Sequence, residues 1–132
     1  MKALVITEHG PPDVLRVEER PDPDPASGEV RVRVRAAGVN FADLLGRVGL
    51  YPDAPKPPCV VGYEVAGDVD AVGEGVRDYE VGQRVMGACR FGGYAQLAVT
   101  KPPPAPNSVN WRPAARRTLK STVLVFSLLA ER

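Results

Sequence analysis

Glycine and proline divide the first hundred residues into short segments, and this spacing limits the length of the helices and strands that the chain can form. Between the interruptions lie runs rich in valine and other apolar residues, at positions 2–7, 14–18, 29–37, 60–72, 81–86 and 94–99. Runs of this length, bounded by glycine and proline turns, predict β-strands. Many short strands joined in this way are typical of a β-barrel or a sandwich. We therefore expect a mainly β domain with short helices.

The clearest predicted strand is Glu29–Ala37, in which valine and arginine alternate. Side chains on a strand point alternately to opposite faces, so one face is apolar and the other is cationic. The cationic face carries Arg31, Arg33 and Arg35. Two interpretations are open at this point. The arginines form a phosphate-binding surface, or they form the solvent face of an antiparallel sheet, which the alternation alone explains.

A short helix is predicted over Asn40–Val48, where apolar residues recur with helical spacing. Asn40 stands where an N-cap is expected, and Asp43 falls in the first turn, where the helix dipole favours a carboxylate. Gly62 and Gly67 interrupt the strand that follows. Glycines at such positions suggest a bulge or the close approach of two backbones.

Charge and hydropathy argue against several classes of protein. Seventeen basic and sixteen acidic residues leave a net charge of +1, so no net attraction to nucleic acid or to an anionic membrane is expected. No run reaches the ~20 apolar residues that a membrane-spanning helix needs. The apolar run at the N-terminus is too short for a signal peptide. We expect a soluble, cytoplasmic protein.

The sequence shows no pattern for a metal site or for a phosphate-binding loop. His9 is the only histidine, and no cluster of potential ligands has metal-binding spacing. Cys59 and Cys89 are expected to be thiols, with a bridge between them as the alternative. Gly73–Gly75 is interpreted as a hairpin turn, because Asp78 stands where a dinucleotide fingerprint needs its third glycine.

The composition changes after residue 100, and we expect a domain boundary there. Residues 101–106 are mostly proline, and residues 118–132 read as a helix whose apolar surface is wider than one narrow face. We therefore expect residues 1–100 to form one domain, and residues 101–132 to be a linker and helix that begin a missing or altered second domain. The alternative is a helix that pairs two copies in a homodimer. The chain would then be a non-enzymatic interaction module.

Several segments of the first hundred residues carry motifs of one known family. The segments are Ala36–Asp43 with Arg47–Pro52 (A-x-G-x-N-x-x-D…R-x-G-x-Y-P), Pro58–Gly67 (P-x-x-x-G-x-E-x-x-G), Val69–Val76 with Val81–Val85 (V-x-x-V-G-x-x-V…G-D-R-V) and Phe91–Ala95 (F-G-G-Y-A). Gln83 replaces the usual aspartate of the third motif. In this order, the motifs resemble those of the zinc-free quinone oxidoreductases, a group of medium-chain dehydrogenase/reductases. The resemblance is strongest to the vesicle amine transport protein-like branch.

The resemblance implies a GroES-like, partly open β-barrel that forms the catalytic domain of such reductases. It also implies NADPH as the cofactor, with direct hydride transfer to a quinone or an α,β-unsaturated carbonyl compound. In zinc-dependent relatives, a cysteine ligand stands at the position of Asn40 and a histidine ligand at that of Tyr63, so no metal is expected here. The resemblance assigns catalytic roles to Asn40 and Tyr51, and cofactor binding to Asn40 and Tyr63. Glu64 is expected to support the fold near the site.

The chain also departs from the family pattern. Members continue well beyond this length, with a doubly wound (Rossmann) nucleotide-binding domain that carries a glycine-rich phosphate turn. The resemblance is expected to fade after Lys101, because Arg112–Arg117 does not match the family. We therefore expect the substrate-side half of a reductase, inactive alone and weak in NADPH binding. A further alternative is an enzyme whose second half is a separate polypeptide.

Overall fold

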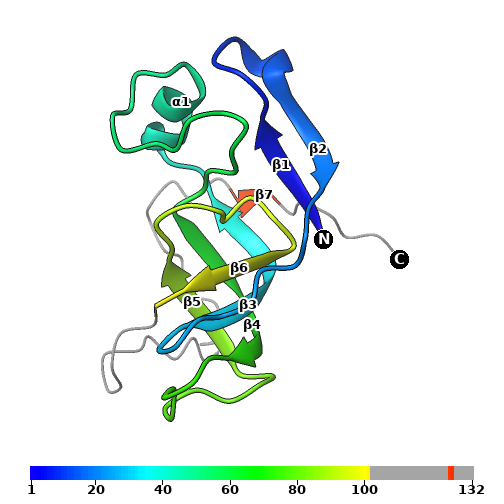
Figure 1. Cartoon of the computed structure of the whole chain (residues 1–132), viewed down its shortest axis with the longest axis vertical. Helices are drawn as coiled ribbons and strands as arrows, with labels where there is room; N and C mark the ends of the chain where they lie inside the picture. Colours follow the sequence, from blue (N-terminus) through cyan, green and yellow to red (C-terminus); the bar gives the residue numbers. More distant parts are fainter. Residues whose placement is uncertain (102–124, 127–132) are drawn as a thin grey trace.

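The computed structural model describes residues 1–101 and 125–126, and within them the chain is mainly β (Figure 1). The elements are β1 (Lys2–Ile6), the 3-10 helix η1 (Pro12–Val14), β2 (Leu15–Glu19), β3 (Val30–Gly38), α1 (Phe41–Arg47), β4 (Glu64–Val72), β5 (Arg84–Ala88), β6 (Leu97–Thr100) and β7 (Val125–Phe126). The prediction of a mainly β domain with short helices is confirmed. No helix in the described part is long and apolar enough to cross a bilayer.

The strands form two antiparallel sheets. β1 and β2 form a hairpin, and a second sheet has the order β5-β4-β3-β6, with β7 beside β3. The hairpin is joined to the rest by two isolated bridges, Ala3 to Ala95 and Ile6 to Cys59. Figure 1 shows the hairpin and helix α1 together at one end of the molecule, beyond the larger sheet.

The larger sheet curls until its outer strands meet, but they form no ladder. The Thr100 hydroxyl on β6 donates a hydrogen bond of 2.5 Å to the Ala88 carbonyl on β5. No strand pairing between β5 and β6 accompanies this contact in the described part of the chain. The result is the partly open barrel expected of a GroES-like domain.

The apolar face of β3 builds the core. Val30 and Val32 are 2% and 1% exposed. They pack with Val65, Tyr79, Cys89 and Ala98 from the neighbouring segments. A smaller cluster of Ile6, Val14 and Val61 joins the hairpin to the segment before β4. Burial of valines at alternate positions stabilises the sheet and confirms the predicted apolar face of β3.

The arginines on the cationic face of β3 pair with aspartates of β4. Arg31 and Arg33 both pair with Asp70, with a distance of 2.7 Å from Arg31 Nε to Asp70 Oδ2. Arg35 Nε lies 2.9 Å from Asp68 Oδ2. The three guanidinium groups are therefore occupied by carboxylates of the same sheet, which supports the solvent-face interpretation over phosphate binding.

Gly67 lets β3 and β4 approach closely, as the sequence predicts. A Cβ atom at this position would lie 2.0 Å from the carbonyl oxygen of Arg33. The pairing register of β3 also shifts between Val34 and Ala36, which marks a bulge. The hairpin turn predicted at Gly73–Gly75 follows the end of β4, and Gly75 has a φ of 80°.

Three strands begin at least three residues later than predicted. Strand β5 begins at Arg84 instead of residue 81, because Gly82 has a φ of 89° and its N–H donates to the Val69 carbonyl within a turn. Strand β6 begins at Leu97 instead of residue 94. Strand β4 begins at Glu64, since residues 60–62 instead bond to the loop at residues 92–94.

The helix predicted over residues 118–132 is wrong at two positions. Val125 and Phe126 form β7, which pairs with Gly38 and Ala37 of β3. The end of β3 offers free backbone groups there, since β6 pairs only with Val30–Arg33. The remainder of the predicted helix, and most of the predicted second unit, lie outside the described residues.

Candidate functional site

Helix α1 places two of the predicted site residues at its ends. Asn40 is the N-cap, directly after β3. At the other end, the Leu50 N–H donates to the Leu45 carbonyl at 2.9 Å, and the Gly49 N–H to the Gly46 carbonyl. Gly49 has a φ of 77°, so it closes the helix in the left-handed conformation. Tyr51 follows this turn at once.

Asp43 connects the helix to the rest of the site. It is only 4% exposed, and its carboxylate accepts three hydrogen bonds. The donors are the Asn40 N–H at 2.8 Å, the Gly62 N–H at 3.0 Å and the Tyr94 hydroxyl at 2.6 Å. The sequence places Asp43 in the first turn, but its links to Gly62 and Tyr94 were not predicted.

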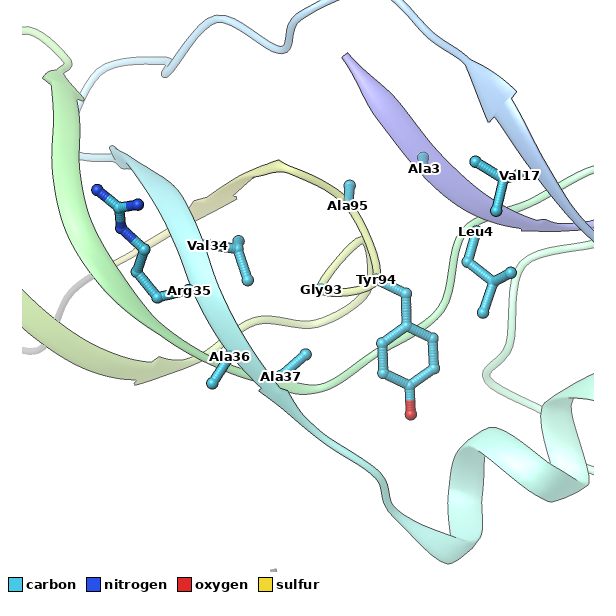
Figure 2. A pocket seen from close by; sticks show the side chains of 10 residues that line it. All are labelled: Ala3, Leu4, Val17, Val34, Arg35, Ala36, Ala37, Gly93, Tyr94 and Ala95. Atoms are coloured by element: carbon cyan, nitrogen blue, oxygen red, sulfur yellow. The ribbon is translucent and has the colours of Figure 1, made fainter. Parts of the chain in front are cut away.

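Tyr94 stands between the hairpin and β3. Figure 2 shows its ring near Leu4 and Ala37, with the hydroxyl pointing toward the start of helix α1. Burial, together with the hydrogen bond to Asp43, raises the pKa of Tyr94 well above the ordinary value. The hydroxyl therefore remains a proton donor to Asp43 at any physiological pH.

The segment before β4 is held by the loop that carries Phe91. The Tyr94 N–H donates to the Val61 carbonyl at 3.0 Å, and the Cys89 N–H donates to the Tyr63 carbonyl at 2.8 Å. Gly62 has a φ of 107°, and a Cβ there would lie 2.8 Å from the Tyr94 ring. These contacts fix Tyr63 beside Phe91.

Tyr51, Tyr63, Phe91 and Arg90 form a continuous series of contacts, here named the aromatic row. The rings of Tyr51 and Tyr63 meet edge to face, with centroids 5.9 Å apart. The ring of Phe91 lies 5.4 Å from that of Tyr63, and the guanidinium carbon of Arg90 lies 5.9 Å from the Phe91 centroid. Two of the three predicted site residues, Tyr51 and Tyr63, are thus in contact.

Two polar atoms of the site are buried without a hydrogen-bond partner among the described residues. They are Asn40 Nδ2 and Tyr63 Oη. The β3–β4 ladder ends at the pair Gly38 and Glu64, so Asn40 and Tyr63 both lie just beyond that end. Burial, followed by the neighbouring Tyr51, raises the pKa of Tyr63 to about 12, so its hydroxyl remains protonated. Leaving a buried donor unpaired costs about 1–3 kcal/mol, and an external acceptor would recover that energy.

Two cavities of the domain reach Tyr94. A hollow of about 280 Å³ reaches Asp43 and Tyr94 and is otherwise mostly apolar. The smaller hollow in Figure 2 lies between the hairpin and β3. Neither of these two cavities is lined by Asn40, Tyr51 or Tyr63.

Both cysteines are free thiols, as expected from the sequence. Burial raises the pKa of Cys89 to about 11, and it also raises the pKa of Cys59. Neither thiol is therefore an activated nucleophile. The part of the chain that the structure describes contains no cluster of three potential metal ligands.

Sequence reasoning did not assign Phe91, Tyr94 or Arg90 to the site. Phe91 and Tyr94 belong to a motif that carries the family resemblance, and this could have indicated their place. Arg90 carries no such signal, since it precedes the motif. Glu64 is exposed at the start of β4, and its carboxylate lies against Gly38, next to the site.

The match to a known domain model decides the family. Residues 26–103 match the alcohol dehydrogenase GroES-like domain. The chain belongs to this family. The matched region contains β3, α1, β4, β5 and β6, and with them every residue of the candidate site.

The similar proteins are quinone oxidoreductases and their relatives. The synaptic vesicle membrane protein VAT-1 homolog of Rattus norvegicus is 48% identical over 104 residues, which cover 77% of this chain and 26% of that protein. The quinone oxidoreductase of Pseudomonas aeruginosa is 38% identical over 131 residues, covering 96% of this chain and 40% of that protein. The chain thus spans less than half the length of these relatives. The second match covers nearly the whole chain and therefore continues beyond Lys101.

Solved structures show the same relationship. The human synaptic vesicle membrane protein VAT-1 homolog-like protein superposes with a TM-score of 0.74 at 39% identity, over 76% of this chain and 33% of that chain. The Escherichia coli quinone oxidoreductase complexed with NADPH gives a TM-score of 0.72 at 36% identity, over 76% of this chain and 31% of that chain.

Proposed function

We propose that this domain forms the acceptor side of a hydride-transfer site that reduces a quinone or an α,β-unsaturated carbonyl compound with NADPH. Relatives at 38% and 36% identity are quinone oxidoreductases, and the second was solved as an NADPH complex. A further relative, at 42% identity, is an acryloyl-coenzyme A reductase, whose named substrate is an activated C=C compound.

The pair of unpartnered donors carries the proposal. Asn40 Nδ2 and Tyr63 Oη are buried N–H and O–H donors that find no acceptor among the described residues. A quinone or enone carbonyl and the carboxamide of a nicotinamide each present an oxygen acceptor. The donor set therefore fits both the acceptor substrate and the cofactor named by the resemblance. When bound, NADPH supplies the hydride.

In this proposal, the chain's own residues bind and orient the acceptor. Asn40 and Tyr63 donate to carbonyl oxygens, and donors aimed at an oxygen that gains negative charge stabilise the transition state. Tyr51 packs its ring against Tyr63 and narrows the access of water to that donor. Asp43 holds the backbone of Asn40 and of Gly62, the residue before Tyr63, and is thus a positioning residue.

We further propose that residues 1–100 form the acceptor-side domain and that they do not complete a cofactor site. Holding a dinucleotide requires donors for its pyrophosphate, which glycine-rich turns at helix N-termini supply. Helix α1 has seven residues, and Asn40 is its N-cap. The Asp43 carboxylate accepts the Asn40 N–H and so occupies the N-terminal end of the helix. Binding through Asn40 and Tyr63 alone should be millimolar or weaker, about −4 kcal/mol.

Two titrations of the purified chain, followed by tyrosine fluorescence, test these statements separately. A soluble quinone should quench the fluorescence saturably, and Asn40→Ala should weaken its binding about fivefold, as expected for one hydrogen bond. NADPH should give no saturation below millimolar concentration. A quinone that does not bind overturns the acceptor-side role. Micromolar NADPH binding overturns only the statement that the cofactor site is incomplete.

A further inference from the structure

The aromatic row has ends of opposite charge. At one end, Asp53 follows two residues after Tyr51 in the sequence. At the other end, the guanidinium of Arg90 stacks over Phe91. Phe91 in turn contacts Tyr63, which carries one of the unpartnered donors. A flat molecule bound at Tyr63 therefore has a cationic group on its Phe91 side.

Arg90 differs from the arginines of β3. Arg31, Arg33 and Arg35 are all paired with carboxylates of β4. Arg90 is exposed, and among the described residues its one recorded interaction is the ring of Phe91. A guanidinium that lies over an aromatic ring keeps its N–H groups available for an anion. Its charge is not paired with a carboxylate in that part of the chain.

We propose that Arg90 makes the site selective for acceptors that carry an anionic substituent, such as a carboxylate, on a planar conjugated ring. The inference rests on the proposed function and specifies its substrate class. The carbonyl of such an acceptor receives hydrogen bonds from Asn40 and Tyr63. Its ring lies along the aromatic row, and its carboxylate pairs with Arg90.

A matched pair of ligands isolates this charge. Anthraquinone-2-carboxylate and anthraquinone-2-carboxamide have nearly the same shape and differ in one negative charge. Their dissociation constants are measured on the full chain at low ionic strength, for the wild type and for two variants. Arg90→Gln removes the proposed selector. Arg77→Gln is the control, because Arg77 is also exposed and lies in the turn beyond the far end of β4 from Tyr63.

The wild type should bind the carboxylate about threefold more tightly than the carboxamide, a ratio typical of one exposed ion pair. The preference should shrink as salt is added. Arg90→Gln should bind the two ligands equally, while Arg77→Gln should keep the wild-type ratio. Circular dichroism confirms that each variant is folded.

The outcomes separate this inference from the proposed function. Equal binding of both ligands by the wild type overturns the role of Arg90 and leaves the acceptor site standing. An unchanged preference in Arg90→Gln does the same. If neither quinone binds, the acceptor site itself is overturned, and the inference with it. If inorganic pyrophosphate removes the preference at constant ionic strength, Arg90 serves a phosphate group, and its assignment to the acceptor is wrong.

Discussion

Buried apolar side chains hold the larger sheet in place, whereas a buried carboxylate helps to hold helix α1. In the sheet, Val32 and Val69 are each 1% exposed and pack in the core. In the helix, Phe41 and Leu44 are 73% and 48% exposed, while the one buried charged residue is Asp43. Apolar burial thus organises the sheet, whereas a carboxylate with three donors anchors the helix that carries Asn40.

This difference separates stability from function within a small domain. Packed valines resist movement because every neighbour fills its space. Helix α1 instead has its position set by a few directed bonds, made by Asp43 in its first turn and between Arg47 and Gly10 at its end. Asn40 stands at the start of that helix, so its placement depends on Asp43 more than on the core.

The largest expected effect is in the sheet, at Gly67. Gly67→Ala would place a methyl group 2.0 Å from the Arg33 carbonyl oxygen, so β3 and β4 would have to separate. We expect a loss of at least about 3 kcal/mol in the free energy of unfolding. Gly87→Ala is the control, since its nearest neighbour would be 3.9 Å away. Urea denaturation measures both variants, and equal midpoints would refute the close approach of the two strands.

The second prediction compares the stability lost when Asp43, which anchors helix α1, is replaced with the stability lost when the exposed Phe41 is replaced. Asp43→Ala leaves three donors without their acceptor, and we expect a loss of about 3 kcal/mol. Phe41→Ser should change stability by no more than about 0.5 kcal/mol, because that side chain is mostly in solvent. Urea denaturation compares the two. A larger loss for Phe41→Ser would mean that apolar packing holds the helix after all.

The smallest effect is expected from the Tyr94 hydroxyl, and it depends on pH. Tyr94→Phe removes one of the three donors to Asp43 and should cost about 1 kcal/mol near neutral pH. The pKa of Tyr94 is raised in the folded state above its usual value of 10.0. Above that pH the unfolded chain loses this proton while the folded chain keeps it, so stability falls as the pH rises.

The variant lacks this titration, so its loss of stability on the alkaline side should be shallower. Urea midpoints measured from about pH 8 to pH 11 for both proteins give the comparison. Tyr63, whose pKa is raised to about 12, contributes the same trend to both proteins and therefore cancels. Parallel pH profiles would show that the Tyr94 proton is not retained on folding.

Local patterns predicted the local features of this fold. Alternation predicted the two faces of β3, and the position of Asn40 predicted the start of α1, because both depend on neighbours within a few residues. Strand β5 was placed too early, because a valine in a turn looks like a valine in a strand. The alternation also left open what the arginines bind, since Asp68 and Asp70 lie more than thirty residues away along the chain.

The site was predicted only in part, for the same reason. The resemblance selected Asn40, Tyr51 and Tyr63, and the structure brings Tyr51 and Tyr63 into contact. The hydrogen bonds of Asp43 reach residues 19 and 51 positions away, and no local pattern records such links. The charge that Arg90 adds to the row becomes visible only when the loop before β6 folds against Tyr63.

The contact between strands β5 and β6 has a consequence for how the domain opens locally. A single recorded hydrogen bond, from Thr100 to Ala88, makes that contact in the described part of the chain, whereas every other strand contact in the larger sheet is a ladder. Local opening takes the route with the fewest bonds to break. The barrel would therefore part at this contact while its ladders remain paired. The lifetime of the closed contact between β5 and β6 would then set how long the thiol of Cys89 stays shielded from water. The stability of the whole domain would not set it.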